Sequence, residues 1–163
     1  MTIEVITPLK DLEVVKAELN RGRRWLFFRA PEIVEVEIFY KPYYVVEAEY
    51  SLDRRPESAK CAVIVDAYSG IPIMIQGLLT TEPVRPGDER VLAPDFDQDL
   101  AREYARDTVL KCVYRRRLVF PRLEYSSVTL VYRKFFSFRR RGESRAFLTP
   151  ADHYEIGEKA AAH

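Results

Sequence analysis

Apolar residues recur at helical spacing in two segments of the chain. The first segment places four of them on one helical face: Leu9, Leu12, Val15 and Leu19. Thr7 and Pro8 suit a helix start, because threonine caps free amides and proline is tolerated in the first turn. Gly22 suits a helix end. We therefore predict a helix over Pro8–Asn20.

The second helical segment follows an acid-rich stretch, Asp95–Asp99. Its apolar stripe is continuous over four turns: Leu100/Ala101, Tyr104/Ala105, Thr108/Val109 and Cys112/Val113. The acids alternate as at the start of a calcium loop. However, Leu100 stands where that loop needs glycine, and Arg106 where it needs a bidentate glutamate. We therefore predict that these acidic residues cap the start of the helix and interact favourably with the positive end of its dipole.

Elsewhere, apolar and polar residues alternate with a period of two, which is typical of strands with one solvated face. Before residue 80 the predicted strands are 33–40, 43–52, 60–67 and 71–75, with Pro42 interrupting the first two. After the second helix they are 118–120, 127–138 and 145–149. The fold class predicted is α+β, with two helices packed on a mainly antiparallel sheet.

The two halves of the chain resemble each other. A shift of 86 residues, which places Ser51 on Ser137, aligns Ser51–Tyr68 with Ser137–Tyr154 without a gap. Seven positions in this window are identical: Ser51/Ser137, Arg54/Arg140, Arg55/Arg141, Glu57/Glu143, Ser58/Ser144, Asp66/Asp152 and Tyr68/Tyr154. Average composition predicts about one or two such matches. The sequence therefore predicts a tandem duplication of a helix-plus-β-meander unit.

The duplication suggests a division of the chain. We predict a first α+β unit at 1–79, a linker at 80–94 that is rich in Pro and Gly, and a second α+β unit at 95–158, the two sharing one compact fold. Residues 159–163 are interpreted as the remnant of a purification tag.

Charge and composition narrow the functional classes. There are 26 basic and 25 acidic residues, and this balance argues against a surface that attracts nucleic acid everywhere. Asn and Gln are scarce, as in many heat-adapted proteins, so a thermophilic source is expected. We see no signal peptide and no long apolar segment, and therefore expect a cytoplasmic protein with no membrane partner. Cys61 and Cys112 are expected to be buried thiols, with a bridge between them as the alternative.

Arginine clusters are the best candidates for a binding surface. The richest is Arg133–Arg145, where arginines stand beside strand aromatics and are suited to phosphates and bases. The candidate nucleic-acid or ligand-binding residues are Arg23, Arg24, Arg115, Arg116, Arg117, Arg133, Arg139, Arg140 and Arg141. The alternative is a hairpin with core aromatics in its strands and a solvated basic tip.

The turn at Val65–Gly70 carries a resemblance. Asp66, Ser69 and Gly70 stand as in the Asp-x-x-Ser/Thr-Gly turn, and the surrounding Tyr43–Ile75 resembles PepSY-type domains. This resemblance implies a small α+β module with a helix packed on antiparallel strands. Turn chemistry alone also explains Asp66, because its side chain can bond the following amides.

No catalytic motif stands out, and no cofactor or metal ligands are predicted. His153 is the only histidine besides the terminal one, and acid–base chemistry would rest on scattered carboxylates such as Asp66 and Glu124. The leading hypothesis is a non-enzymatic interaction or assembly module with a protein partner or a second copy of itself. The alternatives are a nucleic-acid-binding protein that uses the Arg133–Arg145 hairpin, and a small hydrolase.

Overall fold

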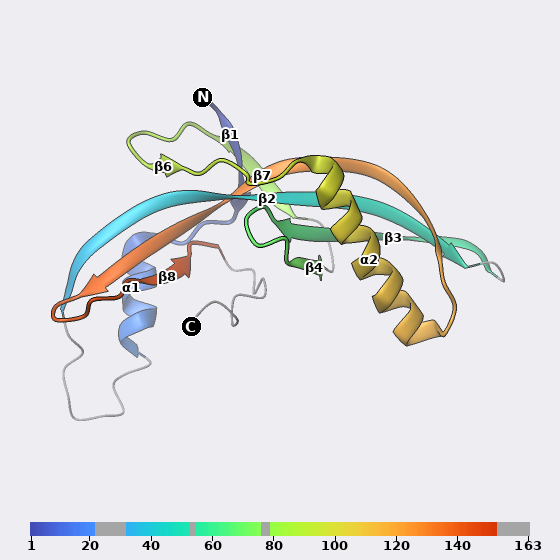
Figure 1. Ribbon diagram of the computed structural model, residues 1–163. Helices are drawn as coiled ribbons and strands as arrows, with labels where there is room; N and C mark the ends of the chain where they lie inside the picture. Colours follow the sequence, from blue (N-terminus) through green and yellow to red (C-terminus); the bar gives the residue numbers. More distant parts are fainter. Residues whose placement is uncertain (22–31, 53–54, 76–78, 153–163) are drawn as a thin grey trace. The chain divides into compact units, whose positions relative to one another are not determined.

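The computed structural model describes residues 1–21, 32–52, 55–75 and 79–152. Two helices and a mixed, mostly antiparallel eight-stranded sheet make up the described chain (Figure 1). The helices are α1 (Leu12–Arg21) and α2 (Gln98–Arg117). The strands are β1 (Ile3–Thr7), β2 (Ile33–Leu52), β3 (Arg55–Asp66), β4 (Pro72–Ile75), β5 (Thr80–Val84), β6 (Arg90–Val91), β7 (Arg122–Arg140) and β8 (Phe147–Pro150). The predicted α+β class is confirmed.

The sheet has the strand order β4-β3-β2-β7-β1-β5, with β6 beside β2 and β8 beside β7. Two long strands, β2 and β7, are neighbours in its middle (Figure 1). Two contacts indicate their relative direction. Glu35 of β2 contacts Arg139, whereas Glu47, further along β2, accepts a hydrogen bond from Ser127, further back along β7. The partner number falls as the residue number rises, so the strands run antiparallel.

Tertiary contacts divide the chain into two compact units, each built from separate segments. Unit 1 is formed by Met1–Lys41, Thr80–Leu92 and Tyr132–Tyr154, and unit 2 contains Pro42–Leu79 and Ala93–Val131. Each long strand therefore passes from one unit into the other. These units are defined by contacts, and they do not test the predicted division of the chain at residues 79 and 95.

Unit 1 has its core between α1 and one face of the sheet. Val15 of α1 is buried with Phe136, Phe138 and Ala151, and Phe147 packs against them. Most of the core residues on β2 and β7 are even-numbered, as the period of two requires: Val36, Ile38, Phe136 and Phe138. Ile33, the first residue of β2, also packs against this core. The odd-numbered residues Glu35, Glu37 and Arg139 belong to the other face.

Unit 2 is organised in the same way around α2. Its buried stripe is Ala101, Ala105, Val109 and Val113, at a spacing of four residues. These small side chains pack on Tyr44 and Val46 of β2 and on Val63 and Val65 of β3. Asp97 caps the helix, because its carboxylate accepts hydrogen bonds from the amides of Asp99 (3.1 Å) and Leu100 (3.0 Å). The predicted capping role of the acid-rich stretch is confirmed.

Several predicted boundaries were wrong. The first helix begins at Leu12, because Thr7 is instead the last residue of β1 and is paired with Thr80. β2 runs through Pro42 without a break. The predicted linker 80–94 contains β5 and β6, since main-chain pairing needs no hydrophobic pattern. Residues 118–120 are not a strand but the turn that ends α2.

Candidate interaction surface

Four candidate residues lie at the hairpin that joins β7 to β8, and we call them the hairpin arginines: Arg133, Arg139, Arg140 and Arg141. Arg133 is not at the surface. It and Asp152 both have fully buried side chains, with 2.8 Å between Nε and Oδ2 and 2.8 Å between Nη2 and Oδ1. This bidentate ion pair is possible because the guanidinium and the carboxylate are both planar and match in geometry. Arg133 is therefore part of the core and is unable to meet a partner.

Arg140 is also buried, with 3% of its surface exposed. Its guanidinium lies over the ring of Phe147, 4.9 Å from the ring centre. Its Nε and Nη1 atoms have no hydrogen-bond partner in the part of the chain that the structure describes. Burying a guanidinium whose N–H groups lack hydrogen-bond acceptors costs free energy, and the cation–π contact offsets only part of that cost.

The remaining two hairpin arginines are exposed but paired across the sheet with glutamates. Arg139 contacts Glu35, and Arg141 lies 2.9 Å from Glu32. Exposed pairs of this kind add little stability, but each places a carboxylate beside the cation. Of the four hairpin arginines, two are therefore buried and two are exposed beside carboxylates. The interpretation of Arg133–Arg145 as a phosphate-binding hairpin stays a prediction.

The other candidate arginines lie elsewhere. Arg23 and Arg24 are outside the described residues. Arg115, Arg116 and Arg117 form the last turn of α2, in unit 2, and all three are exposed. We call these three the α2 arginines.

The α2 arginines adjoin a turn with an unusual backbone. Leu118 ends the helix with a φ of 57°, and its amide donates to the Tyr114 carbonyl at 2.7 Å. Glycine is common at such a position, because a Cβ there costs about 1–2 kcal/mol. Leu118 is nevertheless 76% exposed. Leu118 thus has a strained backbone and gains little burial in return.

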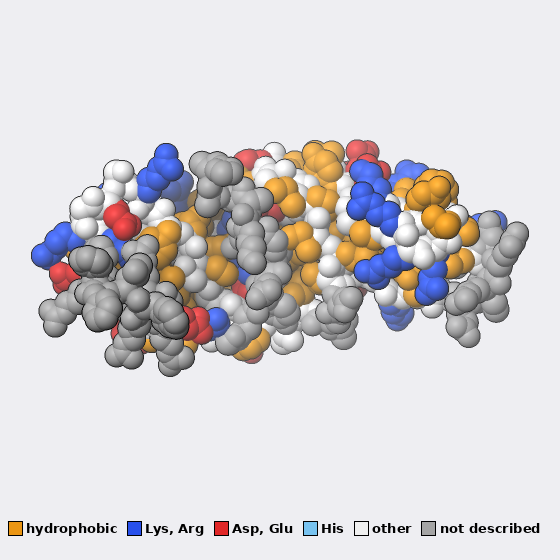
Figure 2. Space-filling view, turned by 90° about the horizontal axis from the view of Figure 1, so that it is seen from below, with side chains coloured by type: hydrophobic (Ala, Val, Ile, Leu, Met, Phe, Trp, Pro, Cys, Tyr) orange, Lys and Arg blue, Asp and Glu red, His pale blue; other side chains and the backbone are white. Residues whose placement is uncertain are grey.

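Neighbouring apolar side chains are exposed as well. Val119 and Phe120 follow Leu118, and Phe120 is 65% exposed. The rings of Tyr114 and Phe120 stack, with 4.5 Å between their centres and 18° between their planes. Figure 2 shows Lys and Arg side chains beside hydrophobic ones where α2 ends. We call this surface the α2 tip: Tyr114, Leu118, Val119 and Phe120 together with the α2 arginines.

Sequence reasoning placed the α2 arginines in the candidate set but missed the apolar half of the tip. Leu118, Val119 and Phe120 form an apolar run after a helix and were therefore predicted to be a strand. Pro121 directly after the run was the available signal, since the residue before a proline often marks an element boundary.

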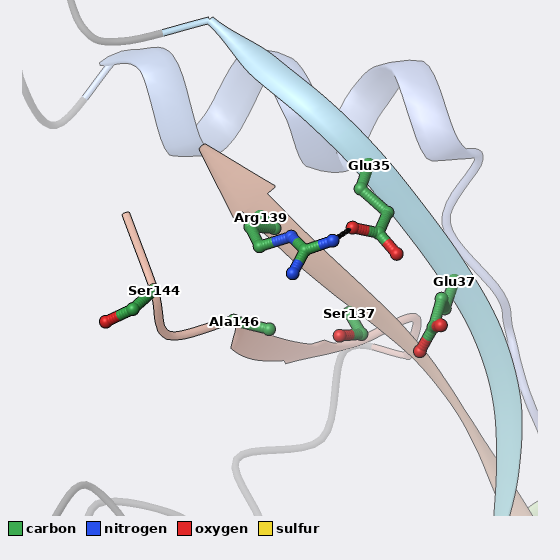
Figure 3. Close-up of a pocket in the computed structure, with 6 residues that line it drawn as sticks. All are labelled: Glu35, Glu37, Ser137, Arg139, Ser144 and Ala146. Carbon is green, nitrogen blue, oxygen red and sulfur yellow. Dashed lines mark hydrogen bonds and ion pairs between the residues drawn. The ribbon is translucent and has the colours of Figure 1, made fainter. Parts of the chain in front are cut away.

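One hollow of about 160 Å³ lies on the outer face of unit 1 (Figure 3). It is lined by Glu35, Glu37, Ser137, Arg139, Ser144 and Ala146. Figure 3 shows Arg139 directed at Glu35, so the arginine that lines the hollow is neutralised by one of its carboxylates. A hollow of this size is below the usual range for a small-molecule site.

Other candidate chemistry in the described chain is structural. The Asp66 carboxylate accepts hydrogen bonds from the amides of Tyr68 (2.9 Å) and Ser69 (3.3 Å), so Asp66 is a turn residue. Cys61 and Cys112 are free thiols, and burial raises the pKa of Cys61. Among the residues described, no three His, Cys, Asp or Glu side chains gather as metal ligands would, and neither helix is long and apolar enough to cross a bilayer.

Comparison of the chain with protein-family models, with curated proteins and with solved structures finds no match. The resemblance of the Val65–Gly70 turn to PepSY-type domains therefore stays a prediction, because the hydrogen bonds of Asp66 follow from turn chemistry in any family.

Proposed function

We propose that this chain is a non-enzymatic binding module that holds a macromolecular partner at the α2 tip. The observation that carries the proposal is Leu118, which is strained in its backbone and exposed in its side chain. Strain that the fold itself does not use is often retained for a function. Burial of the Leu118 side chain by a partner would explain why a leucine is kept at this strained position.

The energetics of the tip favour burial by a partner. Removing a Leu, Val or Phe side chain from water contributes about 1.5–3 kcal/mol each. Leu118, Val119 and Phe120 are consecutive, so one partner surface can cover all three. Part of this gain is lost to the cost of association. Micromolar binding is therefore a reasonable expectation, at about 8 kcal/mol.

The sequence supports the same surface independently. Arg115-Arg116-Arg117-Leu118-Val119-Phe120 follows α2, and Arg23-Arg24-Trp25-Leu26-Phe27-Phe28 follows α1 closely in the chain. Both segments combine adjacent arginines with a leucine and a phenylalanine. The first of them lies outside the described residues, so this support comes from sequence alone.

Photo-crosslinking from the tip tests the proposal. Phe120 is replaced by p-benzoylphenylalanine in the organism that makes the protein, and Leu148 is replaced likewise as a matched control. Leu148 is also a large exposed apolar residue, 58% exposed, but it lies on β8 in unit 1. We expect discrete adducts from position 120 and none of the same mass from position 148. Identical adduct patterns from both positions would refute the proposal.

Nucleic-acid binding is the second candidate, now placed at the tip instead of the hairpin. The observation that favours it is the stacked pair of Tyr114 and Phe120 beside three exposed arginines. Bases stack on aromatic rings, and arginines pair with phosphates. It predicts that a single-stranded oligonucleotide binds with an affinity that falls steeply with salt. Binding that is absent at low ionic strength would exclude it.

We also propose that the chain arose by tandem duplication, with elements exchanged between its halves. Element order supports it, since β1-α1-β2-β3 and β6-α2-β7-β8 have the same sequence of elements. The pairings are reciprocal. β1 of the first half pairs in parallel with β7, and β6 of the second half pairs in parallel with β2. Likewise α1 packs against Phe147 of β8, and α2 against Val63 and Val65 of β3.

Splitting the chain tests the exchange. Segments 1–79 and 80–163 are expected to assemble in equal amounts when they are co-expressed, because each provides the strands and the helix that the other lacks. Neither segment alone should unfold cooperatively. A segment that folds alone with a cooperative transition would contradict the proposed exchange.

A further inference from the structure

We infer that the partner of the α2 tip is an acidic polypeptide segment that sets apolar side chains among its carboxylates. This inference rests on the proposed binding function and adds the chemical class of the partner.

Charge pairing along α2 gives the first step. Arg102 lies 3.0 Å from Asp99, and Lys111 lies 3.9 Å from Asp107. These cations therefore have carboxylates on their own helix. Arg115, Arg116 and Arg117 have no ion pair with any residue that the structure describes. The basic side chains in the middle of α2 are thus balanced by acidic ones, whereas the carboxyl-terminal end of the helix carries uncompensated positive charge.

The helix dipole does not neutralise the α2 arginines either. A helix carries about half a negative charge at its carboxyl end. Three arginines exceed that charge several times over, so helix stabilisation accounts for one of them at most. The remaining positive charge attracts an anionic partner.

The apolar residues decide among anionic partners. Nucleic acid offers flat bases that stack on rings, but Leu118 and Val119 are aliphatic and have no ring to stack. An anionic membrane surface is typically bound by clusters of about 4–8 basic residues, more than the three at the tip. Tyr, Phe and Arg together are the residues enriched at the centres of protein interfaces. A polypeptide therefore fits both the charge and the apolar part of the tip.

Arginine also suits carboxylates in detail. Its planar guanidinium binds a carboxylate through two parallel hydrogen bonds. This chain uses that geometry in its own core, where Arg133 holds Asp152. At the tip the same geometry is available to Asp or Glu side chains of a partner, which flank apolar residues that cover Leu118 and Phe120.

Selection from a displayed library of random peptides tests the inference. The full-length protein is the bait, and the composition of the enriched peptides is the first readout. We expect enrichment of Asp and Glu together with Leu, Phe or Trp. The most enriched peptide is then synthesised, and its dissociation constant is measured with each variant.

Two tip variants and two matched controls decide whether such a peptide uses the tip. The tip variants are Leu118→Ser with Phe120→Ser, and Arg115→Glu with Arg117→Glu. The controls are Leu148→Ser and the pair Arg85→Glu with Arg145→Glu, all at exposed positions. We expect each tip variant to weaken binding about tenfold or more and the controls to leave it unchanged. Thermal unfolding of each variant shows that the fold is kept.

The other outcomes separate the two proposals. Enriched peptides without acidic residues, or acidic peptides that bind all variants equally, overturn the inference. Binding at the tip by oligodeoxythymidine alone, or by phosphatidylserine vesicles alone, overturns the acidic-peptide inference but leaves a binding function. If no peptide, oligodeoxythymidine or vesicle binds in a way that depends on Leu118 and Phe120, the proposed binding function of the α2 tip and the inferred acidic partner both fail.

Discussion

The hairpin arginines and the α2 arginines are chemically identical and equally conspicuous in the sequence, yet the fold uses them differently. Arg133 is buried against Asp152, and Arg139 and Arg141 are paired with glutamates. The three arginines at the end of α2 stay exposed beside Leu118 and Phe120. The comparison teaches that a run of basic residues becomes a candidate surface only where the fold leaves carboxylates out of reach and apolar side chains uncovered.

The largest effect expected from this comparison concerns Arg133. The Arg133→Ala variant leaves the Asp152 carboxylate buried without its cation, and breaking a buried pair costs about 3–5 kcal/mol. We expect urea denaturation to show that loss in the free energy of unfolding. Arg116→Ala, which removes an exposed arginine of the α2 tip, should change the free energy by less than about 0.5 kcal/mol.

A double variant sharpens the result. Arg133→Met with Asp152→Leu removes both charges and keeps an apolar side chain at each position. It should recover most of the stability that Arg133→Ala loses, because the cost comes from a buried carboxylate that has lost its arginine. Equal stability losses for Arg133→Ala and Arg116→Ala would erase the distinction between the two clusters.

Arg140 should behave in the opposite way. Arg140→Met keeps an unbranched apolar stem on Phe147 and removes the buried N–H donors that have no partner among the described residues. Each unsatisfied buried group costs about 1–3 kcal/mol, and the lost cation–π contact offsets part of the gain. We expect the free energy of unfolding to rise by about 1–2 kcal/mol in chemical denaturation. A clear loss of stability would contradict the view that the unpartnered donors of Arg140 destabilise the fold.

Leu118 links stability to binding at the tip. Glycine adopts a positive φ without strain, so Leu118→Gly should raise the free energy of unfolding by about 1 kcal/mol. The same change removes an apolar side chain from the tip and should weaken the binding of an acidic peptide. Calorimetry measures both effects on one variant. A destabilised Leu118→Gly protein would show that Leu118 is held by the fold and not kept for a partner.

The smallest effect is a dependence on alkaline pH near the hairpin arginines. Burial raises the pKa of Tyr132 above its ordinary value of 10.0. As the pH rises above 10.0, the Tyr132 hydroxyl loses its proton in the unfolded chain before it does so in the folded chain. The free energy of unfolding therefore falls as the pH rises through the pKa of the folded state. Tyr132→Phe should make that alkaline loss smaller, as measured by thermal unfolding across the alkaline range.

Local patterns were sufficient to predict much of the fold. The stripe from Ala101 to Val113 predicted α2 and its buried face, since the helical period depends only on neighbouring residues. The alternation around Val46 and Val63 predicted strands for the same reason. Asp97 and Asp66 were correctly assigned to a cap and a turn, because their hydrogen bonds reach only two or three residues along the chain.

What only the tertiary structure decided is which partners distant residues meet. Arg133 and Asp152 are paired because β7 and β8 adopt one register, and nothing in either local sequence states that register. Segment 80–94 has no hydrophobic periodicity. Its first residues nevertheless form strand β5, because their main chain pairs with that of β1. By itself the sequence determined where arginines are abundant. The fold, by distributing carboxylates and apolar cover over long distances, decided that those of the hairpin are buried or paired and that those at the α2 tip are exposed.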